Sequence, residues 1–67
     1  MDIDKLSFDE LSQLINQWVK NERNRAIIKR RMLDGIHYEP LSEEFDISVI
    51  QAKRIVYSAR KELQLHI

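Results

Sequence analysis

With 67 residues, no cysteine and no side chains at metal-ligand spacing, the chain has room for one domain and one core, with no disulfide, metal ion or cofactor expected. Its composition of 43% hydrophobic and 33% charged residues argues against disorder. It has no signal-peptide core and no apolar run near the ~20 residues that a membrane span needs, which predicts a cytoplasmic protein without a membrane partner. The formal net charge is zero, but residues 22–37 and 48–67 each carry +3 while 1–21 carry −2 and 38–47 carry −4, so a basic face can still form.

The first predicted helix occupies about residues 8–20. Ser7 and Glu10 have the spacing of a capping box, and Leu6 lies where a hydrophobic staple begins. One apolar face then recurs at helical spacing and is formed by Leu11, Leu14, Ile15, Trp18 and Val19. We expect this face to pack on the core, with Trp18 as the residue best suited to reach a partner as well.

The second predicted helix covers about residues 22–34. Gly35 follows it directly, where a left-handed residue commonly closes a helix. Asn21 and Asn24 weaken the junction with the first helix, so the sequence leaves open a bend or a nearly continuous helix. The helix also carries five cations: Arg23, Arg25, Lys29, Arg30 and Arg31. These cations either contact phosphates or pair with the acidic residues Glu39, Glu43 and Glu44.

A short third helix and a tight turn are predicted next. Pro40 suits the first helical position because it has no N–H to leave unpaired there. Leu41 and Phe45 lie four residues apart and can face the same core. Asp46 then tolerates the positive φ that a tight turn requires. Ser42 is small enough for a close crossing with the helix that follows.

The fourth predicted helix begins after Ser48, a good N-cap. One side of it is an apolar stripe: Ala52, Ile55, Val56, Ala59 and Leu63. The opposite side combines cations with a tyrosine and an isoleucine: Ile50, Lys53, Arg54, Tyr57 and Lys61. The whole chain is therefore predicted to be an all-α, four-helix single domain over residues 1–67.

A short helix, a tight turn and a longer helix make up a helix-turn-helix, which we predict over about residues 39–64. In this motif the second helix enters the major groove and its first turns reach the bases, so we expect the helix from Ser48 to about residue 65 to bind double-stranded DNA. Lysine and arginine can contact phosphates or guanine, glutamine can read adenine, and isoleucine can touch a thymine methyl group. The predicted DNA-binding residues are Ser48, Val49, Ile50, Gln51, Lys53, Arg54, Tyr57 and Lys61.

Residues 23–63 resemble the promoter-reading helix-turn-helix of bacterial sigma factors, region four of the sigma-seventy type. The matching stretches are 30–39 (RRMLDGIHYE), 41–48 (LSEEFDIS), 53–55 (KRI) and 59–63 (ARKEL). The resemblance implies DNA recognition through the fourth helix and contact with RNA polymerase, as in small phage or prophage transcription regulators. The chain departs from the family pattern at Ser42 and Asp46, where alanine and glycine are usual.

A second hypothesis remains open, in which the domain is a protein-interaction module. The acidic block Glu39–Asp46 would then dock on RNA polymerase or another regulator, without direct DNA reading. Under either hypothesis no enzyme is expected, because His37 and His66 are isolated and no serine has a base partner at motif spacing. One helix-turn-helix covers only a half-site, so we also predict a homodimer through the helix that contains Trp18, or assembly with polymerase.

Overall fold

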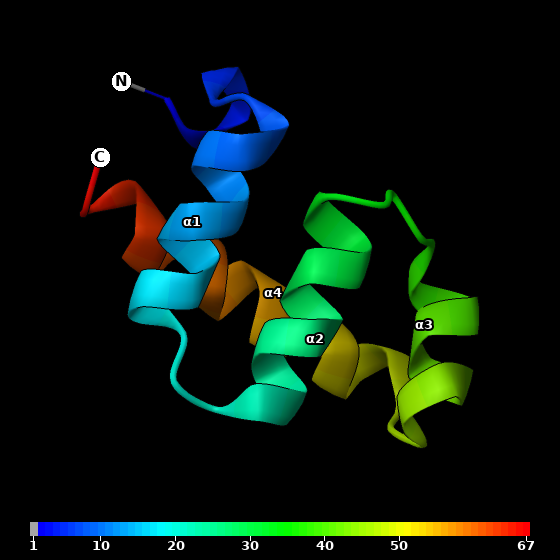
Figure 1. Ribbon diagram of the computed structural model, residues 1–67. Helices are drawn as coiled ribbons and strands as arrows, with labels where there is room; N and C mark the ends of the chain where they lie inside the picture. The colour runs from blue at the N-terminus through cyan, green and yellow to red at the C-terminus, as the bar shows by residue number, and fades with distance from the viewer. Residues whose placement is uncertain (1) are drawn as a thin grey trace.

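The computed structural model describes residues 2–67, and all regular structure in that range is helical. Four α-helices and one short 3-10 helix follow one another in the order η1 (Ile3–Lys5), α1 (Phe8–Trp18), α2 (Glu22–Met32), α3 (Tyr38–Phe45) and α4 (Val49–Gln64). In Figure 1, α4 crosses behind α1 and α2, from the turn beside α3 to the end where both termini lie. The predicted all-α class with four helices is confirmed.

The capping box predicted for α1 is present. The Ser7 hydroxyl accepts from the Glu10 N–H, and the Glu10 carboxylate accepts from the Ser7 N–H. The helix ends at Trp18, two residues before the predicted end, and Asn21 then caps α2 by accepting from the Asn24 N–H at 3.0 Å. The side chain of Asn21 thus satisfies an orphan donor of a new helix, which is why α1 and α2 are separate rather than continuous.

The predicted boundaries of α2 and α3 need small corrections. Gly35 has the expected positive φ of 71°, but α2 already ends at Met32, since the chain turns over Gly35 with the Ile36 N–H donating to the Arg30 carbonyl. Pro40 is the third residue of α3 and not the first. Any N–H in the first turn lacks an intrahelical partner, so proline is tolerated at the third position too.

Two hydrophobic clusters hold the helices together. The first joins η1, α1, α2 and the C-terminal half of α4 through Ile3, Leu11, Ile15, Ile28, Ala59 and Leu63. The second joins α2, α3 and the middle of α4 through Ile27, Leu41 and Val56. Met32 and Ile55 touch both clusters, which makes the two clusters continuous. Of the predicted α4 stripe, all members are buried except Ile55, which is half-buried.

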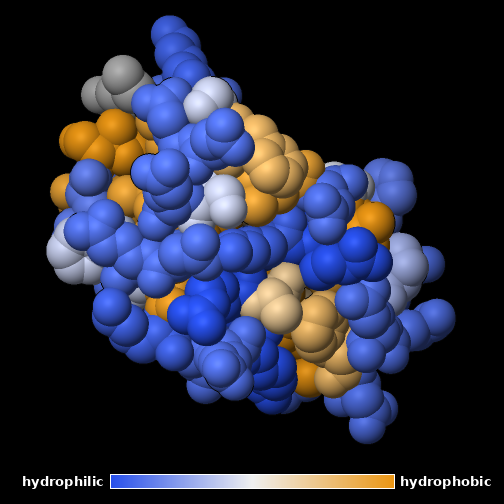
Figure 2. All heavy atoms as spheres, viewed as in Figure 1, coloured by the Kyte–Doolittle hydropathy of each residue, from blue (hydrophilic) through white to orange (hydrophobic). Residues whose placement is uncertain are grey.

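The short helix η1 was not predicted, and its residues bind to α4. Ile3 is only 4% exposed, and its N–H donates to the Gln64 side-chain oxygen at 2.9 Å. Arg60 donates to the Asp4 carboxylate at 2.7 Å. The face in Figure 2 is mostly hydrophilic, with hydrophobic atoms in separate patches, one near the termini and another beside α2. No helix within residues 2–67 has both the length and the apolar character that a membrane span requires.

Candidate functional site

The turn between α3 and α4 sets the direction of α4. Asp46 adopts the left-handed conformation, with φ 55° and ψ 46°, as predicted. The Ile47 N–H then donates to the Ser42 carbonyl at 3.0 Å. Ser42 is buried and its hydroxyl donates to the Glu39 carbonyl, so this polar side chain is satisfied without leaving α3. Leu41 and Ala52 are fully buried nearby.

The predicted outer face of α4 lies in solvent. Ile50 and Tyr57 are 64% and 56% exposed, although their side chains are largely apolar. Lys53, Arg54 and Lys61 are also exposed. We call these five residues the outer face: Ile50, Lys53, Arg54, Tyr57 and Lys61. The structure therefore brings together on one surface the residues that periodicity placed there, although exposure alone does not assign them a ligand.

Three other predicted site residues have different surroundings. Ser48 and Gln51 form a second capping box, in which the Gln51 N–H donates to the Ser48 hydroxyl and the Ser48 N–H donates to the Gln51 side-chain oxygen, both at 3.0 Å. Reading adenine uses both ends of a glutamine amide, and one end already has this partner. Val49 is half-buried. The contacts of these three residues thus stabilise the first turn of α4, and their side chains are less free to contact DNA than those of the outer face.

The cations of the outer face are not neutralised by neighbouring carboxylates. The ion pairs found within residues 2–67 join Arg30 to Asp34 and Glu44, and Arg60 to Asp4. None of these pairs involves the outer face. Its three positive charges therefore remain available to an anionic partner.

Of the two alternatives for the basic residues of α2, pairing with the acidic block is seen within residues 2–67 for one arginine. Arg30 makes a two-pronged contact with Glu44, at 2.8 and 3.1 Å, and these hydrogen bonds raise the pKa of Arg30 above its usual value. Arg25 and Arg31 instead donate to backbone carbonyls, those of Val19 and Ile36. Pairing with the acidic block thus accounts for Arg30 alone.

A cluster around Tyr38 was missed by sequence reasoning. The Arg31 guanidinium lies 4.6 Å from the centre of the Tyr38 ring, Lys53 Nζ lies 5.8 Å from it, and Tyr57 meets it edge-on at 6.3 Å between ring centres. These residues belong to three elements, α2, α3 and α4. Periodicity within one helix could not have grouped them, since only the fold brings them into contact.

Trp18 is half-buried and packs against the first hydrophobic cluster. The ring of His66 stacks on it, with centres 3.6 Å apart and planes 6° apart. Part of the surface expected for a dimer contact is therefore covered by the chain itself. Phe8, Leu65 and Ile67 remain exposed elsewhere in this region.

Comparison of the chain with protein-family models, with curated proteins and with solved structures found no match.

Proposed function

We propose that the domain is a DNA-binding transcription regulator in which α3 and α4 act as a helix-turn-helix. The observation that carries the proposal is the outer face of α4, whose cations form no ion pair within residues 2–67 and which follows α3 after the left-handed turn at Asp46. A major groove admits one α-helix, and a helix with exposed cations on its outer side suits both its shape and its charge. The likeness to sigma-factor region four supports the same proposal.

The position of each side chain along α4 suggests its role. Ile50 lies in the first turn of α4 and Lys53 and Arg54 lie in the second, near the N-terminal end with which a recognition helix reaches the bases. Tyr57 and Lys61 lie further along, where contact with backbone phosphates is expected. Ile50 would touch a thymine methyl group, while Lys53 and Arg54 would approach guanine or phosphate.

The experiment that tests this proposal is a fluorescence anisotropy titration of labelled duplex DNA at low and moderate salt. Wild type should bind and should weaken as salt rises, because bound cations displace counterions from DNA. The double variant Lys53→Glu/Arg54→Glu should lose affinity by roughly 100-fold or more, since each residue supplies a direct contact.

A matched control separates the effect of the site from that of total charge. Lys20→Glu/Arg23→Glu changes the net charge equally but alters exposed residues at the α1–α2 junction. This variant should retain most of the affinity, and both variants should keep the helical circular dichroism spectrum. If Lys53→Glu/Arg54→Glu bound duplexes as wild type does, the proposal would be wrong.

The alternative, docking on polymerase or another regulator, is favoured by one observation. Glu39 and Glu43 are exposed and form no ion pair within residues 2–67, whereas Glu44 is held by Arg30. The variant Glu39→Gln/Glu43→Gln distinguishes the two functions. It should leave DNA affinity unchanged or slightly higher, whereas a docking module would lose capture of purified RNA polymerase.

A further inference from the structure

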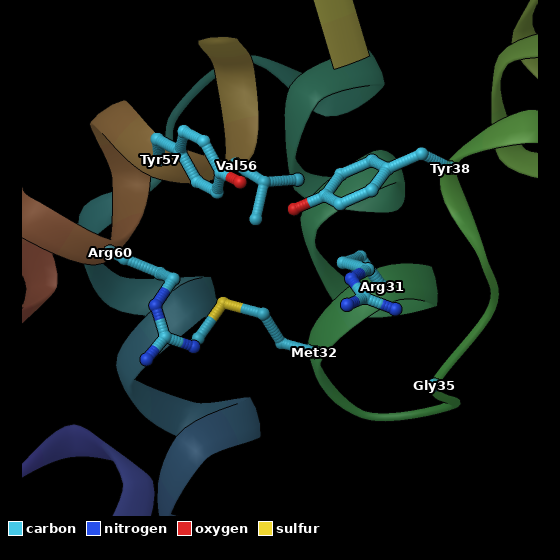
Figure 3. Close-up of a pocket in the computed structure, with 7 residues that line it drawn as sticks. All are labelled: Arg31, Met32, Gly35, Tyr38, Val56, Tyr57 and Arg60. Carbon is cyan, nitrogen blue, oxygen red and sulfur yellow. The ribbon is translucent and has the colours of Figure 1, made fainter. Parts of the chain in front are cut away.

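A cavity of about 430 Å³ lies between α2, the loop that follows it and α4. We call it the two-arginine pocket, and its lining is Arg31, Met32, Gly35, Tyr38, Val56, Tyr57 and Arg60. Figure 3 shows the guanidinium groups of Arg31 and Arg60 on two sides of it, with the hydroxyl of Tyr38 directed into the space. We propose that this pocket binds one phosphate group and, on the basis of the proposed function, that the phosphate belongs to the backbone of the bound DNA.

Arg31 is already held in place for binding an anion. One of its terminal nitrogens donates to the Ile36 carbonyl at 3.2 Å, and its guanidinium stacks on the Tyr38 ring. A guanidinium carries five N–H donors in a rigid fork, so this arrangement fixes the group while leaving donors for a ligand. Fixing a side chain in advance lowers the entropic cost of binding.

Arg60 shows that an anion can reach this side of α4. It already donates to the Asp4 carboxylate at 2.7 Å, and Asp4 belongs to the chain's own N-terminal turn. Arg31 forms no ion pair within residues 2–67, and Lys53 Nζ lies 5.8 Å from the centre of the Tyr38 ring. Of the two arginines that line the pocket, only Arg60 has a carboxylate partner within residues 2–67, so an excess of positive charge remains.

The arrangement of donors favours phosphate over carboxylate. A planar carboxylate is satisfied by a single fork, as the pairing of Glu44 with Arg30 shows in this chain. In the two-arginine pocket the two guanidinium groups come from different helices, and a phenol hydroxyl is available between them. A tetrahedral group with oxygens in several directions can accept from all of these donors.

The location of the pocket points to DNA as the source of the phosphate. Tyr57 belongs both to the pocket lining and to the outer face, so the two surfaces are continuous. When α4 lies in a major groove, the phosphates that border the groove pass on either side of the helix. A phosphate held beside α4 by residues of α2 would fix the position of the helix along the duplex.

The test uses the full chain and the variants Arg31→Gln and Asp4→Asn, titrated with duplexes of unrelated sequence over a range of salt. Arg31→Gln should weaken binding to every duplex about 3- to 10-fold and should lower the salt slope by about one. Asp4→Asn removes the carboxylate that competes for Arg60, and should strengthen binding about 2- to 5-fold. The opposite signs distinguish phosphate binding from damage to the fold, which would weaken binding in both variants.

Two controls accompany these variants. Arg31→Lys keeps the positive charge but loses the forked guanidinium group, so its DNA affinity should lie between those of wild type and Arg31→Gln. Arg23→Gln removes one exposed cation of the same helix outside the pocket, and should leave the salt slope closer to that of wild type. An equal effect of Arg23→Gln and Arg31→Gln would overturn the proposal, since only total charge would then matter.

Titration with inorganic phosphate, followed by NMR of the Tyr38 and Tyr57 ring signals, measures phosphate binding to the pocket in the absence of DNA. Saturable shifts that Arg31→Gln abolishes are expected. If phosphate saturates the pocket but Arg31→Gln leaves DNA affinity unchanged, the ligand is a free phosphate and the assignment to DNA is overturned. If Arg31→Gln changes neither phosphate binding nor DNA binding, the proposal that the pocket binds phosphate is wrong. The result for Lys53→Glu/Arg54→Glu decides separately whether α4 binds DNA.

Discussion

The C-terminal half and the middle of α4 pack against regions of different character. Its C-terminal half packs Ala59 and Leu63 into the first cluster, against α1 and the N-terminal η1. Its middle packs Val56 into the smaller second cluster, against α2 and α3. The region around α3 supplies the turn and the charged surface, whereas the region around α1 supplies most of the buried apolar side chains. The comparison shows that the direction of α4 depends on both regions and not on the turn alone.

The surfaces of the two regions differ in the same way. Around α1 and the termini, exposed apolar side chains accompany the Trp18–His66 stack. Around α3 and α4, the cations Arg31 and Lys53 lie over the half-buried ring of Tyr38, which the exposed ring of Tyr57 meets edge-on. The proposed DNA contact on α4 and the predicted dimer contact at Trp18 would therefore use separate surfaces, so each can be altered while the other is kept.

The largest expected effect is the loss of stability when a buried side chain of either hydrophobic cluster is truncated. Ile15→Ala in the first and Leu41→Ala in the second both truncate fully buried side chains, and each should cost about 2–5 kcal/mol of unfolding free energy. A domain of this size has roughly 3–10 kcal/mol in total, so both variants should be close to unfolding. Urea titration followed by far-UV circular dichroism and by Trp18 fluorescence measures the loss.

The same pair of variants tests whether the two regions unfold together. Because Met32 and Ile55 touch both clusters, the two signals should have coincident midpoints even in Leu41→Ala, although Trp18 lies in the other region. Separate midpoints would show that the α3 region unfolds independently of the α1 region, as a second cooperative unit.

A smaller effect is expected at the turn. Asp46 has φ 55°, where residues with a bulky or branched side chain are strained. Asp46→Val should destabilise the domain by about 1–2 kcal/mol, whereas Asp46→Gly should stabilise it by up to about 1 kcal/mol. Thermal melting of the two variants beside wild type measures both shifts. Destabilisation by glycine would mean that the aspartate side chain, and not the backbone angle, holds the turn.

Local signals in the sequence predicted the helices well. Ser7 and Ser48 start α1 and α4 as expected, Gly35 and Asp46 have the predicted positive φ, and the apolar stripe of α4 is buried. These features depend on residues close together in the chain, which is why spacing reveals them. Helix ends were less accurate, as the early end of α1 at Trp18 shows.

Contacts between distant residues could not be predicted in this way. The Asp4–Arg60 pair spans 56 positions, and the ring of Tyr38 meets Tyr57 only after α3 and α4 have packed. Gln51, predicted as a base contact, is a different case, because its contact with Ser48 is local. The glutamine at the third position of a capped helix was equally consistent with the capping box that the structure shows.

The next smaller effect concerns the two capping boxes. Ser48→Ala and Ser7→Ala each remove a hydroxyl that accepts from a backbone N–H, and each should cost about 1 kcal/mol of unfolding free energy. Only Ser48→Ala alters the start of the proposed recognition helix, so it should also weaken DNA binding. Equal DNA affinities for the two variants would show that the first turn of α4 is not needed in an ordered form.

The smallest effect is a difference in pH response between the same two boxes. The hydrogen bonds from Ser7 lower the pKa of Glu10 below its ordinary value of 4.5, whereas Gln51 in the other box does not titrate. A carboxylate whose pKa is lower in the folded state stabilises the fold at pH above its unfolded value, and this contribution is lost as the pH falls through the folded value. Glu10→Gln converts the α1 box into the type found in α4. Its urea midpoint should therefore fall less than that of wild type between neutral pH and about pH 3. A fall of the same size in both proteins would show that other carboxylates cause the acid sensitivity, and the two boxes would then be equivalent in this respect too.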